Sequence, residues 1–167
     1  MNERKTRRLA PWWVILLRMD LTLAHVGPRP GSKDAYEGLT RLYLDRCKGF
    51  ARCGTDAFKT EDSFLDWVGK RPGRTQPAVV LLDSRGRQMT SEVFASWLGA
   101  RRDGGAQQFV FAIGPASGWS DNARTRGDLL LSLGSITMAH SLARLVLAEQ
   151  IYRAFTILSG HPYHCGH

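Results

Sequence analysis

From residue 20 onward, apolar runs alternate along the chain with stretches in which apolar residues recur at three-and-four spacing. The apolar runs predict strands, and the three-and-four spacing predicts amphipathic helices. The expected strands are residues 20–26, 51–58, 78–82, 109–113 and 129–133. The expected helices are one that Ser32 caps and that runs to about Phe50, a short one opened by Thr60 and Ser63, and others at 91–101, 121–126 and 141–159.

The runs at 78–82 and 109–113 contain no polar residue, which is typical of strands that are covered on both faces. Strands and helices also alternate from one end of this region to the other, and helices are the usual crossovers between parallel strands. The fold class is therefore predicted to be α/β with a mainly parallel sheet. At about 100–200 residues per domain, the 167 residues are expected to form one domain.

The last predicted helix, residues 141–159, is apolar around most of its circumference. Its polar side chains Glu149, Arg153 and Thr156 fall together on one narrow arc. A helix with this pattern is buried, and at the end of a small domain a partner subunit often covers such a helix. We therefore predict a homodimer packed through this helix. The alternative is a central core helix that its own domain covers.

Composition bounds the class of protein and its partners. Hydrophobic residues make up 43% of the chain and charged residues 23%, close to the globular average, which excludes intrinsic disorder. The formal net charge of +8 points to a polyanionic partner. Residues 1–18 hold five Lys and Arg against one Glu, which is half of that net charge. Because Met19 stands directly before the first strand, we expect 1–18 to be an extension and 19–167 to be the domain.

The termini and the cysteines bear on the compartment and on metal binding. The apolar run 11–17 follows basic residues, as in a secretory signal, but no small-residue cleavage site follows it. It is far too short to cross a bilayer, which needs about 20 residues, so no membrane association is expected. Three cysteines form no framework, which favours a reduced, cytoplasmic protein. The tail from His161 to His167 matches no usual zinc spacing, so no metal is expected.

Ligands of an open parallel sheet bind beyond the carboxyl ends of the strands. The loops after Leu82, Ile113 and Leu133 are rich in glycine and small residues. None of them fits the dinucleotide pattern G-x-G-x-x-G or the P-loop pattern. The alternatives are ordinary turns or a pocket lined by backbone groups that suits a small cofactor such as a nucleoside.

A series of short motifs in the second half of the chain resembles one family. They are Val-Val-Leu-Leu-Asp with Gly86 at 79–86, Thr-Ser-Glu at 90–92, Phe-Val-Phe-Ala-Ile-Gly with Gly118 at 109–118, His140 with Arg144, Ala-Glu-Gln-Ile-Tyr-Arg-Ala-Phe at 148–155, and His-Pro-Tyr-His at 161–164. In this order they resemble the SPOUT-superfamily ribosomal RNA large subunit methyltransferase H family. The resemblance implies S-adenosylmethionine as cofactor, a homodimer, and a parallel-sheet fold with a C-terminal trefoil knot. It also implies methylation of N3 of pseudouridine 1915 in 23S ribosomal RNA, on the ribosome or its large subunit.

The same resemblance implies site residues at the matching positions. The cofactor pocket is expected to be lined by Leu82, Gly114, Leu133, Gly134, Ser135, Ile136, Thr137 and Met138. Activity is expected to depend on Glu149, Arg153, Tyr163 and His164. One departure touches the pocket, because Pro115 follows Gly114 where the family has a second glycine, and proline has no backbone N–H to offer a ligand.

The four activity residues also make chemical sense. Methyl transfer to an imide nitrogen needs alignment of donor and acceptor and loss of the acceptor's proton. We expect Arg153 to stabilise the developing anion, with Glu149 orienting it from one turn earlier. His164 is expected to accept the proton or contact a phosphate, and Tyr163 to stack on a base. The alternatives are a SPOUT-type transfer RNA methyltransferase and a non-catalytic module that binds the ribosome.

Overall fold

A computed structural model describes residues 19–31 and 33–165, so the expected extension 1–18 lies outside the described residues. Five strands form one sheet in the order β2-β1-β4-β3-β5, and all neighbouring pairs are parallel. The strands are β1 (Asp20–Val26), β2 (Arg52–Phe58), β3 (Ala78–Gln88), β4 (Gln108–Ile113) and β5 (Leu129–Ser132). The predicted α/β class and parallel sheet are confirmed.

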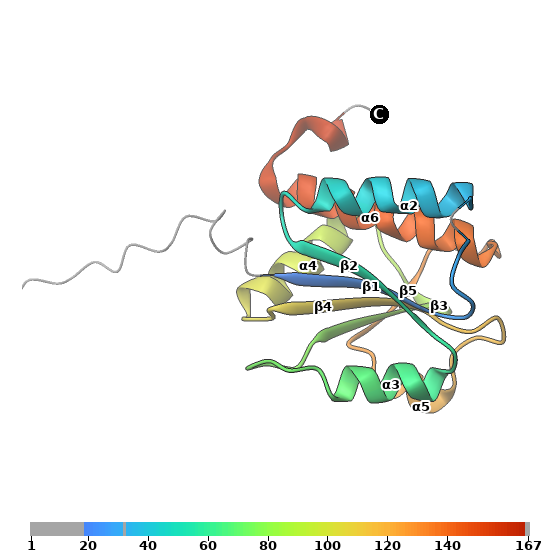
Figure 1. The fold of residues 1–167 in the computed structure, drawn as a ribbon. Helices are drawn as coiled ribbons and strands as arrows, with labels where there is room; N and C mark the ends of the chain where they lie inside the picture. The colour runs from blue at the N-terminus through green and yellow to red at the C-terminus, as the bar shows by residue number, and fades with distance from the viewer. Residues whose placement is uncertain (1–18, 32, 166–167) are drawn as a thin grey trace, which may run out of the picture.

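The helices lie in two layers on either side of the sheet (Figure 1). They are α2 (Ala35–Cys47), α3 (Glu61–Gly69), α4 (Ser91–Asp103), α5 (Asp121–Thr125) and α6 (His140–Ser159), followed by the short 3-10 helix η1 (Pro162–Cys165). α2, α4 and α6 cover one face, whereas α3 and α5 cover the other. None of the helices within the described residues is long and apolar enough to cross a membrane.

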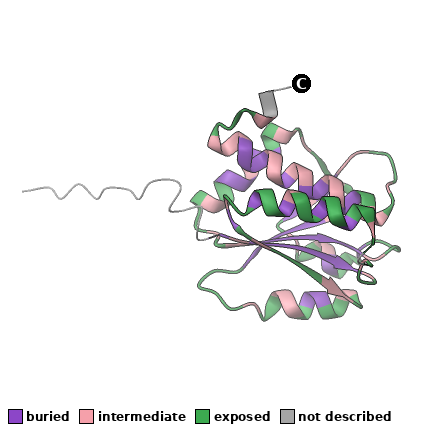
Figure 2. Cartoon of the chain, turned by 45° about the horizontal axis from the view of Figure 1, so that its top comes forward, coloured by how far each residue is buried: buried purple, intermediate pink, exposed green. Residues whose placement is uncertain are grey.

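Both faces of the central strands are buried (Figure 2). Side chains alternate along β4, so that Phe109 and Phe111 pack with α4 and α6, while Val110 and Ala112 pack with α3 and α5. β1 and β3 follow the same alternation. The uninterrupted apolar runs of the sequence therefore reflect a sheet with two cores.

Local capping explains where the helices begin. α3 starts with a reciprocal capping box between Thr60 and Ser63, as the sequence predicts. The cap of α2 is Asp34, whose carboxylate accepts the backbone N–H groups of Tyr36 and Glu37 at 2.8 and 3.2 Å. The prediction of Ser32 as this cap is wrong, because Asp34 directly precedes the first turn.

α6 lies between α2 and α4 over the sheet. Eight of its residues are buried within the chain: Ala143, Arg144, Leu147, Ala148, Ile151, Ala154, Phe155 and Thr156. The buried guanidinium of Arg144 pairs with the buried carboxylate of Glu37 on α2 at 3.0 Å. Burial raises the pKa of Glu37, but its ion pairs with Arg41 and Arg144 outweigh this effect and hold that pKa below its usual value. Packing inside one chain therefore accounts for most of the apolar circumference of α6, and the homodimer stays a prediction.

The close approach of two strands allows only glycine at position 86. β3 pairs with β5 through an irregular register between Leu82 and Arg87, and Gly86 lies in this segment. A Cβ atom at Gly86 would lie 2.7 Å from the carbonyl carbon and oxygen of Leu130. Because backbone atoms cannot swing aside as a side chain can, only glycine lets the two strands meet here.

We expect the substitution Gly86→Ala to lower the free energy of unfolding by about 1–3 kcal/mol, because it overpacks two backbones. Gly69→Ala near the end of α3 is the matched control, since nothing lies within 4 Å of its added methyl group. Urea unfolding of both variants checks this. Equal free energies of unfolding in the two variants would show that β3 and β5 can shift apart at this position without loss of stability.

Candidate cofactor pocket and catalytic cluster

Two adjoining cavities lie beside the middle of β3 and the carboxyl ends of β4 and β5. One of about 500 Å³ lies between residues 82–85 of β3 and the loop after β4, and one of about 250 Å³ lies between residues 82–84 of β3 and residues 132–138. The sequence predicts a loop after Leu82, but β3 continues there to Gln88. Leu82, Asp83, Ser84, Met138 and Ala143 line both. All eight residues predicted to bind the cofactor line one or both cavities: Leu82, Gly114, Leu133, Gly134, Ser135, Ile136, Thr137 and Met138.

Two side chains that the sequence did not identify as pocket residues fix the backbone of the larger cavity. The Trp119 indole N–H donates to the carbonyl oxygen of Leu82 at 3.0 Å, and Nε2 of His140 donates to the carbonyl oxygen of Gly114 at 3.0 Å. A Cβ atom at Gly114 would lie 2.8–3.0 Å from three ring atoms of Trp119. Glycine is therefore required at 114 for the tryptophan to lie beneath the loop.

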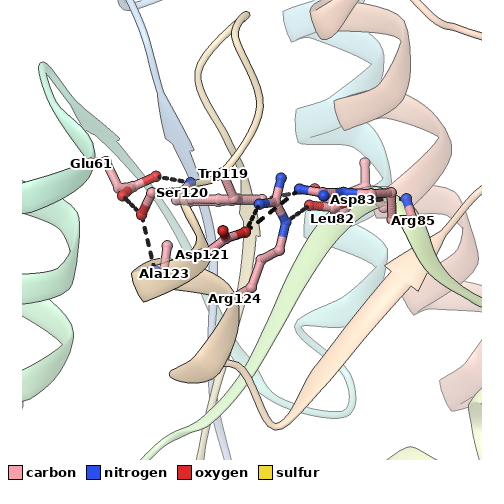
Figure 3. Close-up of polar contacts among 9 residues, drawn as sticks. All are labelled: Glu61, Leu82, Asp83, Arg85, Trp119, Ser120, Asp121, Ala123 and Arg124. Atoms are coloured by element: carbon pink, nitrogen blue, oxygen red, sulfur yellow. Dashed lines mark hydrogen bonds and ion pairs between the residues drawn. The ribbon is translucent and has the colours of Figure 1, made fainter.

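A network of charged groups borders the same cavity (Figure 3). The nearly buried carboxylate of Asp83 accepts the backbone N–H of Arg85 at 2.8 Å and Nε of Arg124 at 2.7 Å. Burial raises the pKa of Asp83, but the N–H of Arg85 and the guanidinium of Arg124 outweigh it, so the pKa lies below its usual value. Arg124 also binds Asp121 at 2.8 Å. The cavity is thus bordered by an ionised carboxylate held in a fixed position.

Glu61 connects this network to α3. One carboxylate oxygen of Glu61 accepts the backbone N–H of Ser120 at 2.9 Å, and the other accepts the Ser120 hydroxyl. The same hydroxyl oxygen accepts the N–H of Ala123 and caps α5. These contacts fix the start of α5, and therefore Arg124, relative to the sheet (Figure 3).

A second polar cluster forms where α6 meets η1. One oxygen of Glu149 accepts hydrogen bonds from Nε and Nη2 of Arg153 at 3.0 and 2.7 Å and from the Tyr163 hydroxyl at 3.1 Å. The other oxygen accepts Nε2 of Gln150 at 2.7 Å. The Arg153 guanidinium also lies 5.1 Å from the centre of the Tyr163 ring, in a cation–π contact.

The surroundings of Arg153 and Tyr163 raise the pKa of both groups. The hydrogen bond to Glu149 raises the pKa of Arg153, so its guanidinium stays charged. Burial, the interaction with the Tyr43 side chain and the negative charge of Glu149 raise the pKa of Tyr163. At neutral pH the cluster therefore presents a cation and a protonated phenol.

The structure brings together three of the four residues predicted for activity. Glu149, Arg153 and Tyr163 are in contact, whereas His164 has a described backbone in η1 but lies outside the described side chains. Sequence reasoning missed the roles of Gln150 and of Tyr152, whose ring lies 4.8 Å from that of Tyr163. Their position within the motif at 148–155 was the available signal.

The cluster and the two cavities lie apart within one chain. Neither cavity is lined by Glu149, Arg153 or Tyr163. His140 lines the larger cavity at the start of α6, and the helix axis rises by roughly 20 Å between His140 and Arg153 at about 1.5 Å per residue. Figure 1 shows η1 and the start of α6 at opposite ends of that helix.

Metal ligands do not gather in the described part of the chain. Across residues 19–31 and 33–165, no group of three or more His, Cys, Asp or Glu side chains is arranged to hold a metal ion.

Comparison with solved structures supports the fold. A probable methylase family protein from Haemophilus influenzae Rd KW20 superposes with a TM-score of 0.52 at 9% identity. The match covers 89% of this chain and 70% of that protein. At this identity the likeness concerns the fold alone.

Comparison of sequences identifies the family. The sequence model described as a predicted SPOUT methyltransferase matches residues 19–164. A ribosomal RNA large subunit methyltransferase H of Koribacter versatilis is 43% identical over 149 residues, which are 89% of this chain and 100% of that protein. A protein of the same name from Brucella anthropi is 52% identical over 87 residues, about half of each chain. The motifs, the parallel sheet and these matches agree, and the chain belongs to the SPOUT methyltransferase family.

Proposed function

We propose that this protein methylates N3 of pseudouridine 1915 in 23S ribosomal RNA with S-adenosylmethionine as methyl donor. The observation that carries the proposal is the convergence of all eight family-implied cofactor residues on two adjoining cavities at the carboxyl ends of parallel strands. The name of the relatives from Koribacter versatilis and Brucella anthropi supports ribosomal RNA as the substrate. Cys47 and Cys53 are free, and free thiols favour a reducing, cytoplasmic setting.

The lining of the cavities fits a cofactor that combines a nucleoside with a charged amino acid. Leu82, Leu133 and Met138 provide apolar surface, and the loop at 133–138 provides backbone groups that suit an adenine edge. The ionised Asp83 lies beside the cavity and attracts positive charge. When bound, S-adenosylmethionine supplies a methyl group on a sulfonium centre.

The catalytic cluster suits the acceptor side of the reaction. An imide N3–H is a weak acid, so the nucleobase needs help from the enzyme to lose this proton. The Arg153 guanidinium stabilises the negative charge that develops on the imide, and Glu149 holds that guanidinium by two hydrogen bonds. Tyr163 stays protonated and presents its ring for stacking, while His164 accepts the proton or contacts a phosphate.

A second copy of the chain completes the site in this proposal. Within one chain the cluster does not line the cofactor cavities, so the donor and acceptor groups need a partner to meet. Large apolar side chains remain exposed on α2 and α6, namely Tyr36, Leu39, Leu42 and Leu142. Covering this surface favours a homodimer in which each cofactor pocket receives the cluster of its partner. The family resemblance adds a trefoil knot in the C-terminal part.

One experiment tests the proposed substrate. Purified protein and S-adenosylmethionine are incubated separately with 70S ribosomes, 50S subunits and transfer RNA, and methylated nucleosides are mapped by mass spectrometry. We expect N3-methylpseudouridine only in the ribosomal samples. Methylation of transfer RNA alone would point to the related transfer RNA enzymes, and an unmodified product in all samples would point to a non-catalytic binding module.

We expect Gly114→Ala to weaken S-adenosylmethionine binding about tenfold or more, because its methyl group collides with Trp119 and displaces the loop. A tenfold change corresponds to about 1.4 kcal/mol. Isothermal titration calorimetry measures the Kd. Gly69→Ala at the end of α3 is the control, since nothing lies within 4 Å of its added methyl group. Wild-type affinity in Gly114→Ala would remove this loop from the cofactor site.

We expect Arg153→Lys to lower kcat for ribosomal RNA methylation about 10²–10³-fold, because lysine keeps the charge but loses the fork that Glu149 holds. The Kd for the cofactor is expected to stay unchanged. Arg52→Lys, at an exposed ion pair with Asp20, serves as the control. Methylation by Arg153→Lys at the wild-type rate would contradict the role given to this guanidinium.

A further inference from the structure

A third cavity of about 510 Å³ lies on the other side of the loop after β4. It opens at the carboxyl ends of β1 and β4, and it shares Ala116 and His140 with the larger cofactor cavity. The chain leaves β1 toward α2 on one face of the sheet and leaves β4 toward α5 on the other (Figure 1). Two neighbouring strands that diverge in this way form the crevice in which parallel sheets bind ligands.

His25 brings an unpartnered acceptor to this cavity. The side chain is 3% exposed, its ring lies 5.7 Å from that of His140, and Nε2 donates to the carbonyl oxygen of Pro28 at 3.0 Å. Burial lowers the pKa of His25, and the nearby Arg144 charge lowers it further, so the ring is neutral. Because Nε2 carries the proton, Nδ1 keeps a lone pair, and this buried atom has no hydrogen-bond partner.

Arg144 brings an unpartnered donor to the same cavity. Its side chain is also 3% exposed, and its Nη2 contacts the carboxylate of Glu37 at 3.0 Å. Its Nε–H group has no hydrogen-bond partner. Buried polar groups in proteins are nearly always paired, so an unpartnered donor and an unpartnered acceptor on two residues that line the same cavity point to a ligand that carries both functions.

The chemistry of this pair distinguishes between ligands. A phosphodiester offers acceptors only and cannot donate to Nδ1 of His25. The edge of a nucleobase that places an N–H beside a carbonyl offers one group to each. The exposed Arg29 also lines the cavity and suits the phosphate of the same nucleotide, and α6, which has no side-chain cap, begins beside it at His140.

We propose that this cavity is a second subsite that binds a nucleobase of the RNA substrate through its N–H and carbonyl edge, read by Nδ1 of His25 and Nε of Arg144. The inference rests on the proposed function for the identity of the RNA. The loop at 114–118 separates the nucleobase bound in this subsite from the cofactor pocket. The subsite therefore holds the RNA strand next to the reacting nucleoside.

Binding is tested first, without methyl transfer. Protein labelled with ¹⁵N at its histidines is titrated with uridine, uridine monophosphate and inorganic phosphate, and the ring nitrogens are followed by NMR. We expect uridine and its monophosphate, but not phosphate alone, to shift the Nδ1 resonance of His25. Equal shifts with phosphate alone would reduce the cavity to an anion site, and no shift with any probe would leave only water there. Either result overturns the proposal.

Variants then link the subsite to the RNA. His25→Gln keeps a donor near Pro28 but places no acceptor at the position of Nδ1, so we expect the KM for ribosomal RNA to rise about tenfold while the Kd for S-adenosylmethionine is unchanged. His25→Asn, which restores an acceptor near Nδ1, is expected to recover part of this loss. Arg144→Lys, which keeps the charge beside Glu37 but lacks Nε, is expected to act like His25→Gln.

The two proposals fail in different ways. If the wild-type protein methylates no RNA but uridine still shifts His25, the proposed function fails and the subsite stands. If the wild-type protein is active and all three variants have wild-type KM values, the subsite fails alone. Thermal unfolding of each variant confirms that the protein compared is folded.

Discussion

The burial of β1, β3 and β4 on both faces is the constraint on which the rest of the molecule depends. A parallel sheet with two cores needs a helix after each strand, and each helix must lie on one face or the other. Here β1 and β3 send the chain to one face and β4, between them, sends it to the opposite face. The loop after β4 therefore has a crevice on each side. The larger of the two adjoining cavities and the third cavity both follow from this single arrangement.

Apolar patterning predicted the strands and helices because each pattern reports the local environment of the chain. This patterning failed where contacts between residues far apart in the sequence determine the structure. β3 continues through the polar residues Asp83–Gln88 because β5 offers backbone partners, and no local signal announces that pairing. The all-round apolar pattern of α6 reflects a position between two helices and a sheet, so this pattern does not by itself require a second subunit.

The candidate site was predicted unevenly for the same reason. The motifs led to the eight cavity residues and to the pair of Glu149 and Arg153, which the helix brings together at a spacing of four. Trp119 and His25 act through contacts with backbone carbonyls, of Leu82 and of Pro28. A tryptophan in a loop and a histidine in a strand look like ordinary core residues until the fold shows what surrounds them.

The first two turns of α6 connect the three cavities. His140 binds the carbonyl oxygen of Gly114 and lies against His25, and Arg144, one turn later, ties the helix to Glu37 on α2. A buried ion pair of this kind costs much to break, because loss of one partner leaves the other charge buried. It therefore fixes the position of α6 along its axis. The same helix carries Glu149 and Arg153 further along, so it also sets where this pair lies relative to the third cavity within one chain. In the proposed homodimer it is the partner's pair that meets the proposed cofactor pocket, so the position of α6 in each chain bears on the site of the other.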